Sequence, residues 1–207
     1  MTVAATGARC ILAVAATLLL AGCGGGGGGD GDGSSEAKVD RSGYFTKRQS
    51  ATINPALADY NEAFRELDTK HDACTKASLR LFKAGKVARV AVKCHLDQTT
   101  AVVDSIDGVG TALGEIDASD YRGACATQLT GSKSFIKRYR DAWKAVLTDW
   151  EAYARGAATS TSSTQRHFDD AYAMSRTFVA DVTVDLAAAC YTKADRATAS
   201  KEAAPTT

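Results

Sequence analysis

Proline is almost absent from this chain of 207 residues. The two prolines are Pro55 and Pro205, so no residue between them is incompatible with a helix. Alanine, which has the highest helix propensity, is abundant over the same stretch. The few glycines there stand mostly where a helix could end. These features predict an all-α protein.

The chain also lacks an excess of positive or negative charge. Lys and Arg number 25 against 24 Asp and Glu, which leaves a net charge of +1. A protein that binds nucleic acid needs surplus cations to displace counterions from the phosphates, so we expect no nucleic-acid partner. Hydrophobic residues make up 45% of the chain. This share is ordinary for globular proteins and predicts one domain with a packed core.

Motifs of redox and catalytic chemistry are missing as well. No Cys-x-x-Cys is present, which excludes a thioredoxin-like motif and a c-type haem attachment. The absence of Glu-x-x-His argues against a di-iron carboxylate site. Asp181 and Asp185 lie one turn apart, but no nucleophile accompanies them, and no phosphate-binding loop is apparent. We therefore expect neither an enzyme nor a bound cofactor.

The beginning of the chain has the pattern of an export signal. Met1–Arg9 carries one positive charge and no acid, and Ile11–Ala21 is apolar apart from Thr17. At a rise of about 1.5 Å per residue, this run is too short to cross a bilayer core of about 30 Å. It has the length expected for the core of a signal peptide.

The apolar run closes with Leu20-Ala21-Gly22-Cys23. A leucine, two small residues and a cysteine in this order resemble the lipobox of bacterial lipoproteins. The resemblance implies that residues 1–22 are a cleaved signal peptide and that Cys23 receives a diacylglyceryl thioether. It implies an exported protein anchored at the cell envelope, and Gly24 in place of Asp resembles outer-membrane lipoproteins of hosts with two membranes. The likeness covers only these residues, and the alternative is an ordinary signal peptide with an incidental cysteine.

Residues 23–51 are expected to form a linker. Gly24–Ser35 is mostly glycine, so it has almost no side chains to bury and a high backbone entropy. The residues that follow, up to Ala51, are polar and mixed. A flexible tether directly after an acylated cysteine would let a folded body stand off from the lipid.

Apolar residues at alternating steps of three and four predict four helices within residues 52–195. The first is expected to begin at Asn54-Pro55, a cap followed by the residue favoured at the first helical position. Gly85 should end it. The second should run over Lys86–Ile116, with three glycines weakening its second half.

The last two helices complete the expected domain. Asp117 is expected to cap the third helix, and Gly156 to end it. Ser162 and Gln165 would form a capping box for the fourth, before a disordered tail over residues 196–207. The faces expected to be buried hold Ile136, Tyr139, Trp143, Val146, Trp150 and Tyr153 on the third helix, and Phe168, Tyr172, Ser175, Val179, Val182, Leu186 and Ala189 on the fourth. Short connections between long helices favour an antiparallel up-down four-helix bundle.

The expected domain contains Cys74, Cys94, Cys125 and Cys190. An even number of cysteines in an exported chain indicates disulfides. Residues that face each other across an antiparallel hairpin are equally far from its turn. The midpoint of the first two cysteines falls at Ala84, and that of the last two just after Gly156, so we expect Cys74–Cys94 and Cys125–Cys190. The pairing of Cys94 with Cys125 stays open as a rival, because the second helix could end near its glycines.

His71 and His95 both fall on faces expected to be buried. With Cys74 and Cys94 they make a ligand set that zinc accepts. Neighbours on a helix diverge by about 100°, however, so Cys94 and His95 cannot easily face one ion, and oxidised thiols are no ligands. Hydrogen-bonded core histidines are the favoured interpretation, and ligation of a metal or a haem by His71 and His95 is the alternative.

Four cations, Lys133, Lys137, Arg140 and Lys144, line one face of the third helix. They could meet anionic lipid or an acidic partner. Neighbouring acids and the neutral total favour a solvated face instead.

Taken together, these patterns predict a membrane-anchored lipoprotein of the cell envelope. Its helical domain would be a binding or structural module for an unknown protein or small molecule. The alternative is a carrier of a small cofactor or metal that uses His71 and His95.

Overall fold

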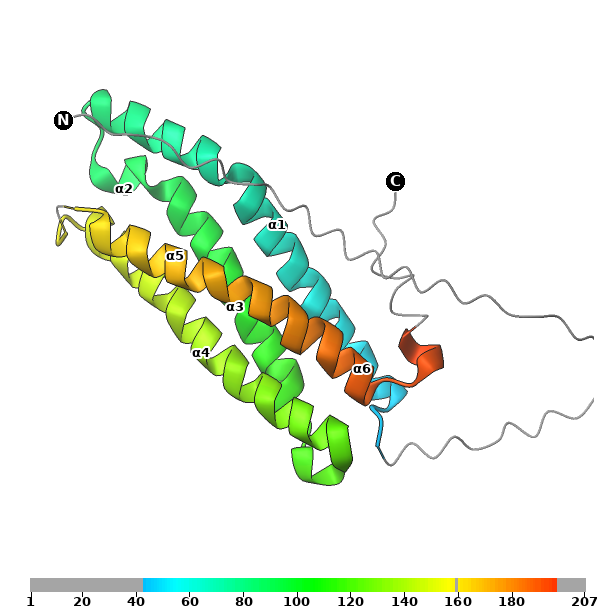
Figure 1. The fold of residues 1–207 in the computed structure, drawn as a ribbon. Coiled ribbons are helices and arrows are strands. Elements are labelled where there is room, and N and C mark those ends of the chain that lie inside the picture. Colours follow the sequence, from blue (N-terminus) through cyan, green and yellow to red (C-terminus); the bar gives the residue numbers. More distant parts are fainter. Residues whose placement is uncertain (1–42, 159, 197–207) are drawn as a thin grey trace, which may run out of the picture. The chain divides into compact units, whose positions relative to one another are not determined.

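The computed structural model describes residues 43–158 and 160–196, and these residues form helices and no strands (Figure 1). The helices are α1 (Lys47–Lys83), α2 (Ala88–Ala91), α3 (Lys93–Gly114), the 3₁₀ turn η1 (Ala118–Asp120), α4 (Gly123–Ala154), α5 (Ser162–Thr177), the π-helix η2 (Phe178–Asp185) and α6 (Leu186–Cys190). The all-α prediction is therefore confirmed. The expected signal peptide, Cys23, the glycine run and residues 197–207 lie outside the described residues.

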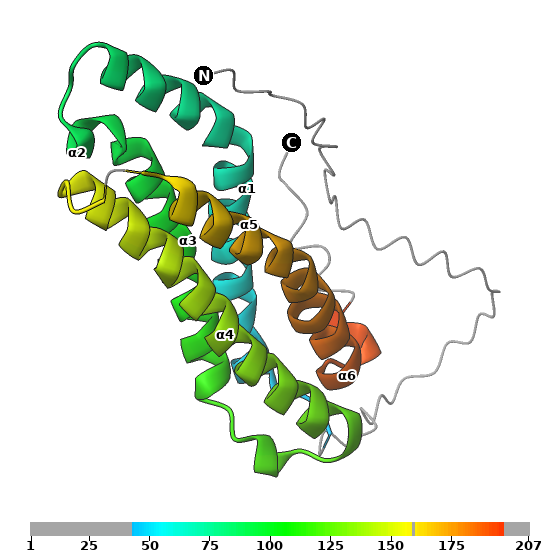
Figure 2. The same cartoon turned by 60° about the vertical axis from the view of Figure 1, so that its left-hand side comes forward.

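The long helices pack in the order in which the chain makes them. α1 packs against α3, α3 against α4, and α4 against the continuous segment of α5, η2 and α6. In Figures 1 and 2 the connection between α1 and α2 and the connection between α4 and α5 lie at one end of the domain. The connection between α3 and α4 lies at the other end.

The core is built around the aromatic face of α4. Tyr139 and Trp143 are fully buried, as the spacing predicts, together with Ile136 and Val146. The hydroxyls of Tyr60 and Tyr139 lie 2.9 Å apart and form a hydrogen bond inside the core. Because a buried hydroxyl needs a polar partner, this bond offsets the cost of enclosing both groups.

The expected start of the first helix is wrong. α1 begins at Lys47, directly after its N-cap Thr46. The backbone N–H of Gln49 donates to the Thr46 hydroxyl, and the backbone N–H of Thr46 donates to the side-chain oxygen of Gln49. This reciprocal capping box satisfies two backbone donors at once. Pro55 lies inside the helix. The sequence signal at Asn54-Pro55 was misleading because a complete cap stands upstream in a segment that looks like polar linker.

Phe45 holds this upstream segment to the domain. Its side chain is 0% exposed, and its ring contacts Tyr121 and Tyr191 with centroids 5.6 and 5.4 Å away. Its amide also donates to the carbonyl of Cys190 at 2.7 Å. Residues from Phe45 onward therefore belong to the helical domain and not to a linker that reaches residue 51.

Two further helix starts differ from expectation. Asp117 accepts from the Ser119 amide and caps η1, whereas α4 begins only at Gly123. Ser162 and Gln165 form no capping box, because α5 has Thr161 as its N-cap and the Gln165 side chain donates to Asp169. Polar side chains near a helix start can bond in several ways, so spacing alone does not choose among them.

The glycines that were expected to end helices do so at the two predicted turns. Gly85 and Gly156 follow α1 and α4 with φ of 70° and 72°, which is the left-handed region that favours glycine. The glycines of the second helix behave differently, since α3 continues to Gly114. A Cβ added at Gly110 would lie 3.4 Å from a side-chain methyl of Ile136 on α4, which is at the limit of ordinary contact.

The fourth helical segment contains a π-helix that the sequence did not predict. Phe178, Val182, Leu186 and Cys190 are all buried and follow one another at steps of four. In an α-helix each step of four turns about 40° past one full turn, so this face would rotate away from the core. The wider turn of η2 compensates for that drift. Phe178 is thus fully buried where Val179 was expected to be.

The role of Phe45 gives a test of the domain boundary. We expect Phe45→Ala to lower the free energy of unfolding by about 3 kcal/mol, because it removes a fully enclosed ring. Tyr44→Ala is the matched control, since the neighbouring ring is 37% exposed. Urea unfolding of both variants measures the difference, and equal, small losses would show that residue 45 is not part of the core.

Candidate functional site

Both expected disulfides are present. Cys74 on α1 joins Cys94 on α3, and Cys125 on α4 joins Cys190 on α6, with Cα–Cα distances of 5.5 and 4.8 Å. The pairing predicted from the hairpin midpoints is confirmed, and the rival pairing of Cys94 with Cys125 is excluded. Disulfides persist in oxidising compartments, so the pairs point to a chain that leaves the reducing cytosol.

The two disulfides differ in exposure. Cys125 and Cys190 are both buried, whereas Cys94 lies on the surface and only its partner Cys74 is enclosed. A thiolate must reach a sulfur atom to exchange with a disulfide. A thiol in solution can therefore reach the Cys74–Cys94 disulfide more easily than the Cys125–Cys190 disulfide.

We expect dithiothreitol under native conditions to reduce Cys74–Cys94 well before Cys125–Cys190. Alkylation of the released thiols followed by peptide mapping measures the two rates, with the buried bond as the internal control. Reduction of the Cys74–Cys94 disulfide, which closes a loop of 20 residues, should lower the free energy of unfolding by about 3 kcal/mol. Equal rates of reduction for the two bonds would contradict the difference in access.

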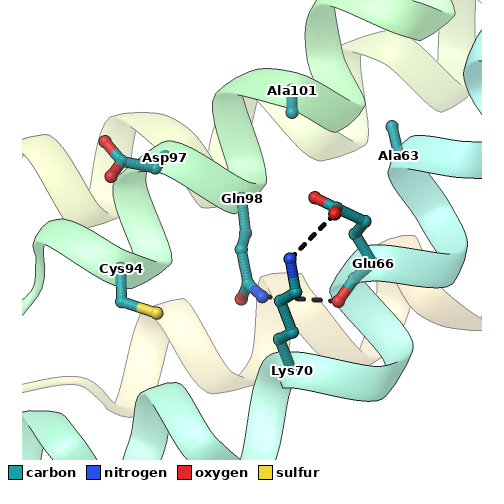
Figure 3. Close-up of a pocket in the computed structure, with 7 residues that line it drawn as sticks. All are labelled: Ala63, Glu66, Lys70, Cys94, Asp97, Gln98 and Ala101. Carbon is teal, nitrogen blue, oxygen red and sulfur yellow. Dashed lines mark hydrogen bonds and ion pairs between the residues drawn. The ribbon is translucent and has the colours of Figure 1, made fainter.

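A groove between α1 and α3 lies beside the exposed disulfide (Figure 3). Its volume is about 200 Å³, and its lining consists of Ala63, Glu66, Lys70, Cys94, Asp97, Gln98 and Ala101. Lys70 pairs with Glu66 at 2.8 Å, and this hydrogen bond and charge lower the pKa of the Glu66 carboxyl. The Gln98 amide donates to the Glu66 backbone carbonyl at 3.5 Å. Asp97 pairs with Lys93, which lies outside the lining. The charged lining groups thus have partners in the protein itself, and they include no nucleophile paired with a base.

The two histidines of the predicted interior faces meet in a cluster of four rings, in which two stacked pairs are joined by an edge-to-face contact between the histidines. His71 on α1 and His95 on α3 have ring centroids 5.6 Å apart. His95 lies parallel to Trp150 of α4 at 4.4 Å, and His71 stacks on Phe168 of α5 at 4.5 Å. We call these four residues the ring cluster. The sequence placed each of them on an apolar face but gave no sign that they contact one another.

Its burial in the ring cluster makes His95 hard to protonate. Burial, and to a lesser extent the charge of His71, lowers the pKa of His95 to about 4. A neutral imidazole is the form that a metal binds. Among residues 43–158 and 160–196, however, no group of three or more His, Cys, Asp or Glu could hold an ion. Cys94 is exposed where His95 is buried, so the two point apart as helix geometry requires.

The depressed pKa of His95 makes stability depend on pH. Below about pH 6.5 the unfolded chain takes up a proton on His95 that the folded domain accepts only near pH 4. The free energy of unfolding should therefore fall by about 2 kcal/mol between pH 7 and pH 5 through this residue alone. Urea unfolding at both pH values, in the wild type and in His95→Leu, isolates the contribution, because the two proteins share every other titratable group. An unchanged pH dependence in His95→Leu would contradict it.

The four cations of the third helix do not form an open basic face. Lys133 donates to the backbone carbonyl of Ile116. Arg140 and Lys144 both pair with Asp107 of α3, at 3.3 and 3.4 Å. Lys137 is exposed. Three of the four therefore bind groups of the protein itself.

Comparison with known proteins adds no relative. No protein-family model matches the chain, and no curated protein or solved structure matches it significantly. In the part of the chain that the structure describes, no helix is sufficiently long and apolar to span a bilayer.

Proposed function

We propose that this protein is an exported lipoprotein, held at the cell envelope by lipid on Cys23, whose helical domain is a binding or structural module. The observation that carries the proposal is the apolar run that ends in Leu20-Ala21-Gly22-Cys23. The two disulfides support export, because such bonds are rare in the cytosol.

The chain between the anchor and the domain suits this arrangement. The domain begins at Phe45, so 21 residues (24 to 44) separate it from Cys23. A flexible linker of that length, as the sequence predicts for most of these residues, would have a root-mean-square span of roughly 25 Å. The domain would then stay close to the bilayer while remaining free to turn.

We further propose that the domain is an antiparallel up-down four-helix bundle. Its four members would be α1, the segment of α2 and α3, α4, and the segment of α5, η2 and α6. Packing between consecutive members and disulfides across the first and last hairpins support this topology. Such a bundle has a closed aromatic core and offers its outer surface and its ends to partners.

A carrier of a small cofactor or metal through His71 and His95 is the second candidate. The contact between the two imidazoles, with His95 neutral, is the observation that favours it. The stacking of both rings on Phe168 and Trp150 favours packing instead. The absorption spectrum and metal content of protein isolated from its own host discriminate the two, because a bound ion lost in His71→Ala would support the carrier.

Acylation is the direct test of the proposed anchor. We expect cells fed an alkyne fatty acid to label the wild-type protein and to leave Cys23→Ala unlabelled and released from the membrane fraction. Retention should need the two chains of the diacylglyceryl group, because one acyl chain gives only marginal membrane binding. Cys10→Ala is the matched control, since that cysteine lies before the apolar run. Equal label on Cys23→Ala would reject the lipoprotein assignment.

A further inference from the structure

Positive charge without any acid is concentrated in two stretches of the chain. Residues 73–96 contain no Asp or Glu and six cations, Lys76, Arg80, Lys83, Lys86, Arg89 and Lys93. Residues 152–168 also contain no acid and include Arg155 and Arg166. The chain as a whole is nearly neutral, so this is a separation of charge and not an excess.

The two stretches meet at one end of the domain. Each contains a chain reversal, one between α1 and α2 and the other between α4 and α5, and both views place these reversals together. The rings of Phe82 and Tyr153 are in contact there, with centroids 5.7 Å apart. We call residues 73–96, 152–158 and 160–168 the basic end. The reversal at the opposite end, residues 115–122, carries three acids and one cation.

The cations of the basic end are exposed, and most are not neutralised. Lys93 pairs with Asp97, and Arg155 with Glu151, both acids at the margins of the two stretches. The other six cations take part in none of the ion pairs found among the described residues. This contrasts with α4, where Arg140 and Lys144 share Asp107.

Apolar side chains stand exposed among these cations. Leu79, Val87 and Val90 are 57%, 69% and 50% exposed, and they are three of the five large hydrophobic side chains exposed in the described residues. On α1, Leu79 lies between Lys76 and Lys83, which are one turn away on either side. Exposed aliphatic side chains interspersed with cations are typical of surfaces that enter the headgroup region of a bilayer.

We propose that the basic end is a docking surface for anionic phospholipid. Phosphate headgroups would neutralise the unpaired cations, while Leu79, Val87 and Val90 would leave water for the boundary of the acyl chains. Nucleic acid offers the charge but no apolar layer for these three side chains. This surface does not depend on acylation of Cys23, so the two proposals can fail separately.

Vesicle binding by the unlipidated chain tests the proposal. Residues 23–207 with Cys23→Ser should cosediment with vesicles of phosphatidylcholine and phosphatidylglycerol, and far more weakly with phosphatidylcholine alone. Replacing Lys76, Lys83 and Lys86 with Glu should weaken binding by more than about a hundredfold, since each cation near an anionic surface contributes about fivefold and the new carboxylates add repulsion. Binding should also fall steeply with added salt.

Matched variants separate this surface from net charge. Replacing Lys47, Lys137 and Lys193 with Glu changes the total charge equally, but these exposed lysines lie outside the basic end, so binding should remain within a few-fold of the parent. Leu79→Ser with Val87→Ser should weaken binding at high salt, whereas Val184→Ser, at an exposed valine of η2, should not. Circular dichroism confirms that each variant is folded.

Three results would overturn the proposal. They are no binding to the mixed vesicles, equal losses in the two triple variants, and binding to polyglutamate in place of vesicles. The last result would assign the basic end to an acidic protein.

Discussion

The positions of the other helices depend on the contacts that their aromatic rings make with the aromatic face of α4. Tyr139 and Trp143 contact rings from α1, α5 and η2, including Tyr60, Phe168 and Phe178. Large rings remove more apolar area from water than any other side chains, and their edges and faces restrict how neighbours approach. The π-helix η2 is best understood from this constraint, because it brings Phe178 under Tyr139 while Cys190 still reaches Cys125.

The features that the sequence predicted correctly share one property: each depends on a single strong local preference. Gly85 and Gly156 take a backbone conformation that other residues avoid, and the rings of α4 recur at helical spacing. The disulfides could be paired because those two glycines located the hairpin turns. The start of α1 has a local signal, the capping box of Thr46 and Gln49, but the pattern at Asn54-Pro55 was preferred to it. The π-helix and the burial of Phe45 depend on contacts with residues distant in the chain. Phe45 is buried by Tyr121 and Tyr191, and nothing in its own neighbourhood reveals that.

For the candidate site, too, the sequence predicted the features that depend on one helix and missed those that depend on contacts between helices. Helical spacing placed His71 and His95 on buried faces, and the structure buries His95 but leaves His71 half-buried. Helix geometry separated Cys94 from His95, and the structure agrees. Periodicity identifies a face but not the height at which residues on different helices meet, so the contacts with Trp150 and Phe168 were not foreseen. The basic end was missed for a related reason. The total charge balances, and only the arrangement of two separate chain reversals brings the cations together.

The two disulfides also determine how the domain can be divided. Each bond closes one pair of helices, and neither crosses from residues 45–114 to residues 123–190. Within the described chain, the only covalent link between these halves is the backbone from Gly114 to Gly123. A single protease cut there would leave two internally cross-linked fragments that only non-covalent packing, above all that of the aromatic core, holds together. The stability of such a nicked domain would depend on protein concentration, as it does for a heterodimer.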